Sequence, residues 1–312
     1  MKAIILAGGY ATRLQPLTDD LSKCLLPVGG KPMVDWILER IRDVGEIDDV
    51  HVVTNSRFAH DFERWAEPQD GVRVHDDGTS SNEDRLGAVG DIAFTLDRAE
   101  IDDDVLVIAG DNLFDYDLED FVQFRRGKGV ASAVAVHDVR DLRLASQYGI
   151  VEVAGDDRIV DFVEKPAEPP STLAATATYI YHREHVPLVE QYLAEGNGPD
   201  QAGSFVAWLQ AREPVYAYRF TGSWLDIGDR AQLLAADNML RRSQRLPDRR
   251  QPLHVRQMHS HQQQWHQQQT YYRQCQQRQY RQRQHQRNKQ KTKLSKHFHI
   301  CLNSINLIFQ RR

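Results

Sequence analysis

The sequence predicts an α/β fold built on a mainly parallel mixed sheet with helices on both faces. Apolar runs of strand length alternate with helical patterns through the first half of the chain, which is the order of βαβ units. The second half adds two strand-length runs joined by AGDD at 154–157, a hairpin signal. Hydrophobic residues make up 41% of the 312 residues, enough to bury a substantial core.

In the first half, apolar runs are predicted strands and stretches with an apolar period near that of a helix are predicted helices. The strands are 3–7, 50–54, 72–75, 105–109 and 131–136. The helices are 33–44, 58–65, 85–96 and 118–124. Ligands of such sheets bind beyond the carboxyl ends of the strands, and Gly8 and Asp111 each follow a strand. We therefore expect both residues to face one crevice.

The second half is less regular, and its elements are predicted from shorter patterns. The predicted strands are 148–153, 158–163, 176–181 and 215–220. The predicted helices are 184–194, 204–211 and 230–242. The last helix would close one domain, 1–242, composed of two lobes at about 1–140 and 141–242.

Charge is distributed unevenly along the chain. Residues 249–312 contain 14 Lys and Arg and no Asp or Glu, so all 44 acidic residues precede them. The stretch 243–312 is rich in Gln, Arg and His and has no helical or strand period, which predicts a disordered basic tail. Such a tract could contact nucleic acid or an acidic surface. The abrupt change in composition favours an adventitious extension instead.

Several protein classes are disfavoured. Cys24, Cys275 and Cys301 are odd in number and far apart, so they indicate neither a disulfide framework nor a CxxC metal site. A core strand begins at the N-terminus with no signal peptide before it, and the apolar stretch 300–309 is too short and too polar to span a bilayer. We expect a soluble cytoplasmic protein that does not enter a membrane.

The N-terminal passage has the chemistry to bind a polyphosphate. Gly8 and Gly9 let backbone N–H groups approach a phosphate closely, because neither carries a Cβ. Arg13, Lys23 and Lys31 add cations that can neutralise phosphate charge. The passage matches neither GxGxxG nor GxxxxGK[ST], which disfavours kinases and GTPases. Two glycines alone are more often a tight turn, so the prediction depends on the ordered series.

Two aspartates are candidates for a metal site. Asp111 directly follows the predicted strand 105–109, and Asp226, in WLDIG at 224–228, could join it from far along the chain. One or two carboxylates plus substrate phosphates are usual ligands of Mg²⁺. Either aspartate alone is more commonly a turn or helix-capping residue, so the metal prediction rests on the pair.

Together these motifs resemble a known family. LAGGYATRLQPLT at 6–18, SKCLLPV at 22–28 and GKPM at 30–33 are similar to the N-terminal signature of the sugar-1-phosphate nucleotidylyltransferases, the glucose-1-phosphate thymidylyltransferase group included. Further motifs that match are GDN at 110–112, YG at 148–149, EKP at 164–166 and WLDIG at 224–228. The resemblance covers residues 1 to about 242 and does not reach the tail.

The resemblance implies a Rossmann-like catalytic domain with a nucleotide-binding lobe at about 1–140 and a sugar-binding lobe at about 141–242. The implied catalytic residues are Arg13 and Lys23. The implied nucleotide-binding residues are Leu6, Ala7, Gly8, Gly9, Arg13, Lys23, Leu86, Gly87 and Asp111, with a loose match at Leu86 and Gly87. The implied sugar-phosphate-binding residues are Tyr148, Gly149, Glu164, Lys165 and Thr176, and the implied metal ligands are Asp111 and Asp226.

The chain departs from the family pattern at three positions. Ala11 replaces the third glycine of GGxGTRL, Ala177 stands where relatives often have glycine, and Asp229 stands where threonine is frequent. No charged catalytic group is lost. We expect these differences to change substrate fit rather than the chemistry.

The implied activity is the Mg²⁺-dependent transfer of a nucleotidyl group from an NTP to a sugar 1-phosphate, giving an NDP-sugar and pyrophosphate. We expect dTTP or UTP with glucose 1-phosphate, and GTP with mannose 1-phosphate is the alternative. A second alternative is a non-catalytic regulatory homologue that binds a nucleotide sugar. The basic tail is the only indication of nucleic-acid binding, and a homo-oligomer is left open.

Overall fold

The computed structural model describes residues 1–249. The strands of the first half are β1 (Lys2–Leu6), β2 (Pro27–Val28), β3 (Lys31–Pro32), β4 (Asp49–Thr54), β5 (Val72–Asp76), β6 (Val105–Ala109), β7 (Asn112–Phe114) and β8 (Ser132–Asp138). The helices of this half are α1 (Met33–Asp43), α2 (Ala59–Ala66), α3 (Gly87–Arg98) and α4 (Leu118–Arg126), with 3-10 turns at Thr12–Leu14 and Lys23–Leu25.

The second half contains more antiparallel structure. Its strands are β9 (Gly149–Val153), β10 (Ile159–Glu164), β11 (Leu173–Tyr181), β12 (Val215–Arg219) and β13 (Trp224–Asp226). Its helices are α5 (Leu142–Ala145), α6 (Leu188–Ala194), α7 (Ala202–Gln210) and α8 (Arg230–Ser243). Asp229 begins α8 with a capping box, its side chain accepting from Gln232 N at 2.8 Å. The aspartate that departs from the family pattern is therefore a helix cap.

Within the described residues, one sheet of nine strands has the order β10-β9-β11-β6-β1-β4-β5, with β8 paired to β11 and β12 paired to β8. Strands β6, β1, β4 and β5 are all parallel, as are β8 and β12. Strand β11 runs antiparallel to β6, β8 and β9. This mixed sheet confirms the predicted Rossmann-like α/β fold.

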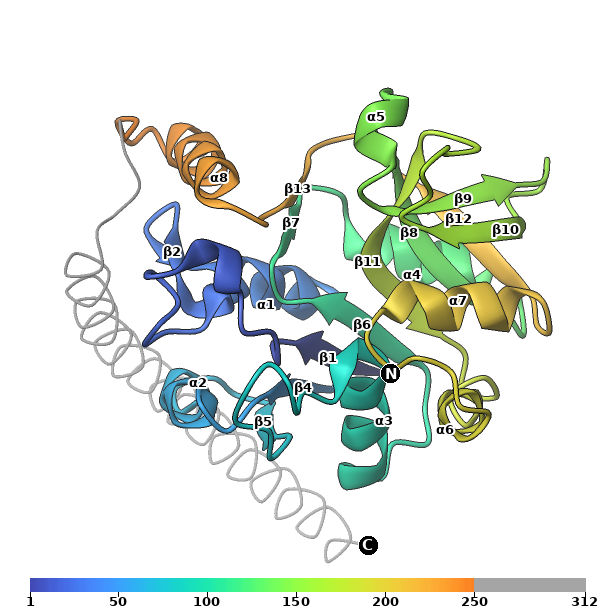
Figure 1. Cartoon of the computed structure of the whole chain (residues 1–312), viewed down its shortest axis with the longest axis horizontal. Helices are drawn as coiled ribbons and strands as arrows, with labels where there is room; N and C mark the ends of the chain where they lie inside the picture. Colours follow the sequence, from blue (N-terminus) through green and yellow to red (C-terminus); the bar gives the residue numbers. More distant parts are fainter. Residues whose placement is uncertain (250–312) are drawn as a thin grey trace, which may run out of the picture. The chain divides into compact units, whose positions relative to one another are not determined.

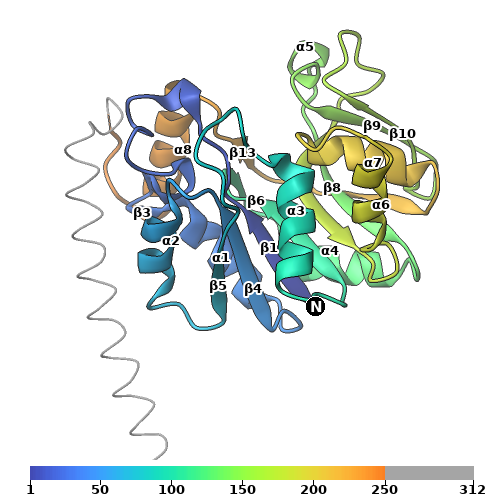
Figure 2. The same ribbon diagram turned by 60° about the horizontal axis from the view of Figure 1, so that its bottom comes forward.

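Helices cover both faces of the parallel part of the sheet (Figure 2). The chain moves outward through β1, α1, β4, α2 and β5, and then returns through α3 to β6. Right-handed crossovers therefore place α3 on the face opposite α1 and α2. Helix α3 packs on β1 and β4 and contacts α6 and α7, whereas α1 packs against α4. The central strands are consequently buried on both faces, with Ile4 and Val107 fully inaccessible.

Strand β11 connects the two halves of the sheet. On one edge it pairs with β8, and on the other Ala174 pairs with β9 while Thr178–Tyr181 pair with β6. Its register against β8 shifts between Ala175 and Tyr179, and Ala177 between them has a φ of 50°. A left-handed residue at a register shift is a bulge, which turns the strand. Ala177 therefore keeps a conformation that glycine adopts more easily.

Small pairings bring distant segments to the carboxyl ends of the central strands. Strand β13 pairs antiparallel with β7, so that Asp226 lies opposite Asn112. Helix α8 packs beside β2 although more than 190 residues separate them (Figure 1). Gly29 N donates to Asp237 Oδ1 at 2.8 Å across this contact. The last helix thus anchors the segment that carries Asp226.

The predicted strands and helices are confirmed to within a few residues, with one larger difference. The helix predicted from 184 begins at Leu188 because Pro187, which has no N–H, takes the N-cap. The sequence did not predict β2, β3, β7, β13 or α5, since an element of two to four residues is too short to show a periodic pattern.

After α8, Arg249 Nε pairs with Asp237 Oδ2 at 3.1 Å, so the first residues of the predicted tail return along the helix. The remainder, 250–312, lies outside the described residues. None of the helices in residues 1–249 has the length and apolar character needed to cross a bilayer.

Candidate active site

The turn after β1 is held by side chains of the neighbouring strand. Thr54 Oγ1 donates to the Ala7 carbonyl at 3.2 Å, and Asn55 Nδ2 donates to the Gly8 carbonyl at 2.8 Å. Gly9 is exposed, and a Cβ there would meet no atom within 4 Å. Farther along the loop, Ala11 has φ 47° and ψ 45°, the left-handed region. The turn therefore leaves the backbone at Gly9 open to an approaching anion.

The three cations of the N-terminal passage have different surroundings. Arg13 is exposed and forms no ion pair with any residue from 1 to 249. Lys31 instead forms an ion pair with Glu39, and its Nζ lies 3.7 Å from the centroid of the Trp36 ring. Glu39 and Trp36 belong to α1, so the structure directs Lys31 away from the turn. The expectation that all three cations converge was wrong for Lys31.

Lys23 contacts one predicted metal ligand and the residue next to the other. Its Nζ forms an ion pair with the Asp111 carboxylate and donates to the Ile227 carbonyl at 2.9 Å. Asp226 precedes Ile227, whose N–H donates to the Asp111 carbonyl at 3.4 Å. The pairing of β13 with β7 thus brings together carboxylates that are 115 positions apart in the chain.

Gly110 places this cluster beside β1. Its N–H donates to the Leu6 carbonyl at 2.8 Å. A Cβ at Gly110 would lie 2.9 Å from that carbonyl oxygen and 2.8 Å from Cys24 Sγ, so only glycine fits. Burial, together with Asp111, raises the pKa of the Cys24 thiol to about 12, which indicates packing rather than nucleophilic chemistry. Asp111, the next residue, is therefore held at the same edge as the Gly8 turn.

The electrostatics of the cluster show which charges converge. Burial and then the Asp111 carboxylate raise the pKa of Asp226 to about 6, whereas Lys23, Lys165 and Arg13 lower it. Burial alone would lower the pKa of Lys23, but its contact with Asp111 raises the pKa above its ordinary value. Two carboxylates and three cations thus influence one another at this edge of the sheet.

A cavity of about 350 Å³ lies between this cluster and the second half of the sheet. The predicted site residues that line it are Leu6, Asp111, Tyr148, Gly149, Glu164, Lys165 and Asp226. The predicted site residues outside its lining are Ala7, Gly8, Gly9, Arg13, Lys23, Leu86, Gly87 and Thr176. The structure therefore brings one carboxylate pair and the EKP motif to a single space.

The Glu164 side chain lies between two glycines. A Cβ at Gly149 would lie 2.9 Å from Glu164 Oε2 and 2.6 Å from Phe162 Cζ, and a Cβ at Gly203 would collide with the same two side chains. Burial raises the pKa of Glu164, and Lys165 opposes the shift. Among the described residues its only charged partner is Lys165, at 3.9 Å. The carboxylate oxygens are thus available to hydroxyl donors in the cavity.

Lys165 has an unusual backbone. Its φ of 46° is in the left-handed region, and its N–H donates to the Tyr148 carbonyl at 3.0 Å. The side chain is 57% exposed, so the backbone rather than burial orients it. A left-handed residue other than glycine costs energy and is most often retained at functional sites.

Thr176 lies elsewhere than the resemblance implies. It is 1% exposed, and its Oγ1 donates to the Ala135 carbonyl at 2.9 Å. The flanking residues, Ala175 and Ala177, line the cavity instead. Side chains alternate along a strand, so the threonine faces away from the cavity.

The N-terminus of α3 meets a loop from the second half of the chain. Val89 N donates to the Pro199 carbonyl at 2.8 Å, and Ala88 N donates to the Asp200 carbonyl at 3.3 Å. Gly87 has a φ of 80°, and a Cβ there would lie 2.6 Å from Pro199 O. Gly87 thus allows the two backbones to approach. A contact between Gly87 or Leu86 and a nucleotide stays a prediction.

Sequence reasoning missed the wall of the cavity opposite β9. It is formed by Asp200, Gln201, Ala202 and Gly203 at the start of α7. These residues belong to no motif that the sequence matches. The only available signal was Gly203 itself, because glycine within a helix is unfavourable unless close packing requires it.

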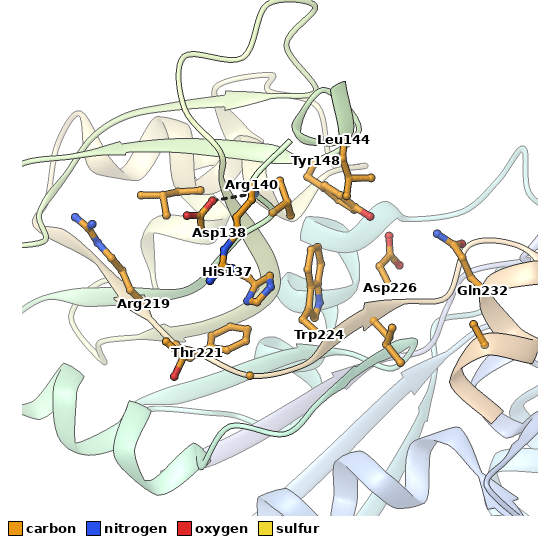
Figure 3. Close-up of a pocket in the computed structure, with 16 residues that line it drawn as sticks. His137, Asp138, Arg140, Leu144, Tyr148, Arg219, Thr221, Trp224, Asp226 and Gln232 are labelled. Carbon is orange, nitrogen blue, oxygen red and sulfur yellow. Dashed lines mark hydrogen bonds between the residues drawn. The ribbon is translucent and has the colours of Figure 1, made fainter. Parts of the chain in front are cut away.

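A second cavity, of about 730 Å³, adjoins the first (Figure 3). Tyr148, Trp224 and Asp226 line both. Trp224 Nε1 donates to Asn112 Oδ1 at 2.7 Å, and the Tyr148 ring packs edge-on to the Trp224 ring with centroids 4.8 Å apart. In Figure 3 the Trp224 ring stands between His137 and Asp226. Tyr148 and Trp224 therefore form a fixed partition between the two cavities.

The protein alone provides few metal ligands at this edge. Residues 1–249 contain no group of three or more His, Cys, Asp and Glu that could hold a metal ion. A metal ion between Asp111 and Asp226 would therefore need ligands from a substrate. Substrate phosphates commonly supply such ligands to Mg²⁺.

Comparisons with known proteins agree with this geometry. Residues 2–243 match the family model described as nucleotidyl transferase. The chain is 27% identical over 240 residues to the bifunctional protein GlmU of Methanocaldococcus jannaschii, covering 77% of this chain and 54% of that protein. It is 29% identical over 232 residues to a Sulfolobus acidocaldarius protein provisionally named mannose-1-phosphate guanyltransferase. That match covers 73% of this chain and 60% of the Sulfolobus protein. The chain thus spans little more than half the length of these relatives.

A solved structure from Bacillus anthracis has a similar fold. It is provisionally named a glucose-1-phosphate thymidylyltransferase and was solved in complex with a sucrose. The TM-score is 0.66 at 25% identity, covering 77% of this chain and 95% of that chain. The family match spans every site residue described above, from Leu6 to Asp226. The chain therefore belongs to the nucleotidyl transferase family.

Proposed function

We propose that the protein transfers a nucleotidyl group from a nucleoside triphosphate, dTTP or UTP, to glucose 1-phosphate. A phosphate oxygen of the sugar 1-phosphate attacks the α-phosphorus of the triphosphate. The bond from that phosphorus to the oxygen bridging to the β-phosphorus breaks, and pyrophosphate leaves. The attacking oxygen is already anionic, so no general base is needed. Catalysis then depends on in-line positioning and charge neutralisation.

The observation that carries this proposal is the position of the carboxylate pair relative to the EKP motif. Asp111 and Asp226, with Lys23 beside them, line the same cavity as Glu164 and Lys165. One end of the cavity can receive a polyphosphate and the other a hydroxylated phosphate ester. A reaction between the two substrates requires this proximity.

The side chains have separable roles in the proposed reaction. Arg13 and Lys23 neutralise the triphosphate and the departing pyrophosphate. Guanidinium and ammonium groups both donate charge-assisted hydrogen bonds to phosphate oxygens. Lys165, oriented by its backbone, holds the attacking phosphate. Glu164 accepts hydrogen bonds from sugar hydroxyls, and Tyr148 closes the side of the sugar site.

The donor set fits a divalent cation. Asp226 lies opposite Asn112, the residue after Asp111, in the β7–β13 pairing, and burial and the Asp111 carboxylate raise the pKa of Asp226 to about 6. A cation would stabilise the charged form of both carboxylates. We infer that these residues hold Mg²⁺, which when bound supplies charge neutralisation to the transferring phosphate.

A pyrophosphate-release assay tests the proposal. The full chain is incubated with Mg²⁺ and each pair of an NTP and a sugar 1-phosphate, with the Asp111→Asn variant as a matched control. We expect the fastest release with dTTP or UTP and glucose 1-phosphate, and little release from the variant. Absence of release from every pair would refute the proposed activity.

Transfer of a guanylyl group to mannose 1-phosphate is the second candidate. The Sulfolobus acidocaldarius relative named for that activity favours it. The same panel separates the two, since GTP with mannose 1-phosphate would then release pyrophosphate faster than the thymidine or uridine nucleotides with glucose 1-phosphate.

A further inference from the structure

Two carboxyl groups outside the cavity converge behind the Gly8 turn. Asp77 follows β5 and Asp91 lies in α3, and their exposed fractions are 9% and 6%. A Cβ at Gly8 would lie 2.6 Å from Asp91 Oδ2 and 3.4 Å from Asp77 Oδ2. Both carboxyl groups therefore pack directly against Gly8, in the turn that follows β1.

No cation of residues 1–249 forms an ion pair with either carboxyl group. Asp77 Oδ1 accepts from Thr79 N and Thr79 Oγ1, both at 2.7 Å, and the Tyr10 hydroxyl lies 3.3 Å from Thr79 Oγ1. Asp91 Oδ1 is buried with no hydrogen-bond partner among the described residues. The charged group that acts on Asp91 is Asp77, and those that act most on Asp77 are acidic, Asp76 and Asp91.

Two buried carboxylates that lie against the same glycine cannot both be ionised at low cost. Burial, followed by the charge of Asp77, raises the pKa of Asp91 to about 8. Burial raises the pKa of Asp77 as well, while its hydrogen bonds from Thr79 oppose the shift. The pair thus retains one proton at neutral pH, and that proton can bridge the two groups.

We propose that Asp77 and Asp91 form a proton-sharing pair that positions the Gly8 turn for the triphosphate, and that ionisation of the pair weakens nucleotide binding. With one proton, the pair is a hydrogen-bonded unit with a single negative charge, packed against Gly8. Without the proton, two like charges repel at contact distance and displace the glycine. A second negative charge also appears behind a turn that must receive an anion. The inference rests on the proposed function, in which this turn binds the NTP.

The test is the pH dependence of NTP affinity. The dissociation constants of dTTP, UTP and GTP with Mg²⁺ and no sugar phosphate are measured by calorimetry for the wild type, Asp91→Asn and Asp97→Asn. Asp97 is an exposed residue of the same helix and serves as the matched control. We expect the wild-type affinity to fall about tenfold between roughly pH 7 and 9.5, since each added charge near a bound anion costs that order of free energy. Asp91→Asn keeps a polar contact but cannot ionise, so its affinity should stay constant, while Asp97→Asn should follow the wild type.

A second readout does not depend on the nucleotide. A carboxyl group whose folded pKa is raised stabilises the fold below its unfolded pKa, and that contribution is lost as the pH rises through the folded pKa. The melting temperature of the wild type should therefore fall more steeply than that of Asp91→Asn between roughly pH 5 and 9. Asp77→Asn removes the repulsion from the other carboxyl group but leaves Asp91 buried, so it should weaken both pH dependences, which covers a failure of Asp91→Asn to fold.

The outcomes separate this inference from the proposed function. A wild type that binds NTP at neutral pH and keeps the same affinity at alkaline pH would overturn the proton-sharing pair alone. An alkaline loss that persists in Asp91→Asn and Asp77→Asn would do the same. A wild type that binds none of the three NTPs at neutral pH would overturn the proposed function, and the role of the pair with it.

Discussion

The two ends of the cavity use different means to prepare for a ligand. At the end formed by β1, β6 and β7, Lys23 and Asp111 already neutralise each other. At the end formed by β9, β10 and α7, the Glu164 carboxylate has one charged partner among the described residues, Lys165 at 3.9 Å, and lies in a space that Gly149 and Gly203 leave free. The first end is arranged by charge and the second by shape. Substitutions that change charge and those that change volume should therefore have separable effects.

The largest effect is expected at the charged end. Lys23→Ala should lower the turnover number about a hundredfold to a thousandfold, because it removes a fixed charge from the developing pyrophosphate. Lys128→Ala, at a half-buried position just after α4 and outside the lining of both cavities, is the matched control. Steady-state kinetics measures the effect, and circular dichroism checks that the variant is folded. A folded Lys23 variant with the wild-type turnover number would contradict the proposed role of Lys23.

A smaller effect is expected at the shaped end. Gly203→Ala should raise the KM for the sugar 1-phosphate by about tenfold while leaving the KM for the NTP unchanged, because the new methyl group displaces Glu164. Gly198→Ala, where a Cβ meets no atom within 4 Å, is the control in the preceding loop. An equal rise in both KM values would show that the two ends are not separable.

Gly87 tests the contact between the halves. Gly87→Ala should lower the free energy of unfolding by about 2 kcal/mol, the sum of a left-handed conformation and a clash with Pro199. Gly196→Ala has a similar φ, 83°, but no atom within 4 Å of the added Cβ, so it should cost about 1 kcal/mol. Urea unfolding measures both. Equal losses would mean that the close backbone approach contributes nothing.

The smallest effect concerns one left-handed alanine at each end. Ala11→Gly and Ala177→Gly should each stabilise the protein by up to about 1 kcal/mol, because glycine adopts a positive φ without a Cβ clash. Thermal unfolding should show rises of a few degrees at most. A fall in melting temperature for either variant would indicate that the alanine methyl group contributes more by packing than its backbone costs.

The charged end could be predicted from the sequence because its signals are local. Gly8 and Asp111 each follow an apolar run, and strand ends meet at one edge of a parallel sheet. Lys31 was misplaced because Glu39 and Trp36, both on the helix that follows it, contact its side chain. The order of residues alone does not show whether a lysine side chain turns toward the preceding loop or toward the following helix.

The shaped end and the carboxyl pair could not be predicted, because both depend on packing between distant segments. Gly203 matters only because α7 packs against β10, which carries Glu164. Asp91 looks like an ordinary polar residue of an amphipathic helix until α3 is placed on β1. The order of the strands was equally hidden, since an apolar period does not reveal that β11 inserts between β6 and β9.

Strand β11 also has a consequence for any attempt to recombine this protein with its relatives. One end of it completes the hydrogen bonding of β6, and the other end supports β9, with the bend at Ala177 between them. A chimaera joined near residue 140 would give the N-terminal parent's β6 a neighbour evolved for another protein. Grafts that alter sugar preference should therefore retain this strand and exchange only the hairpin of β9 and β10 and the loop before α7.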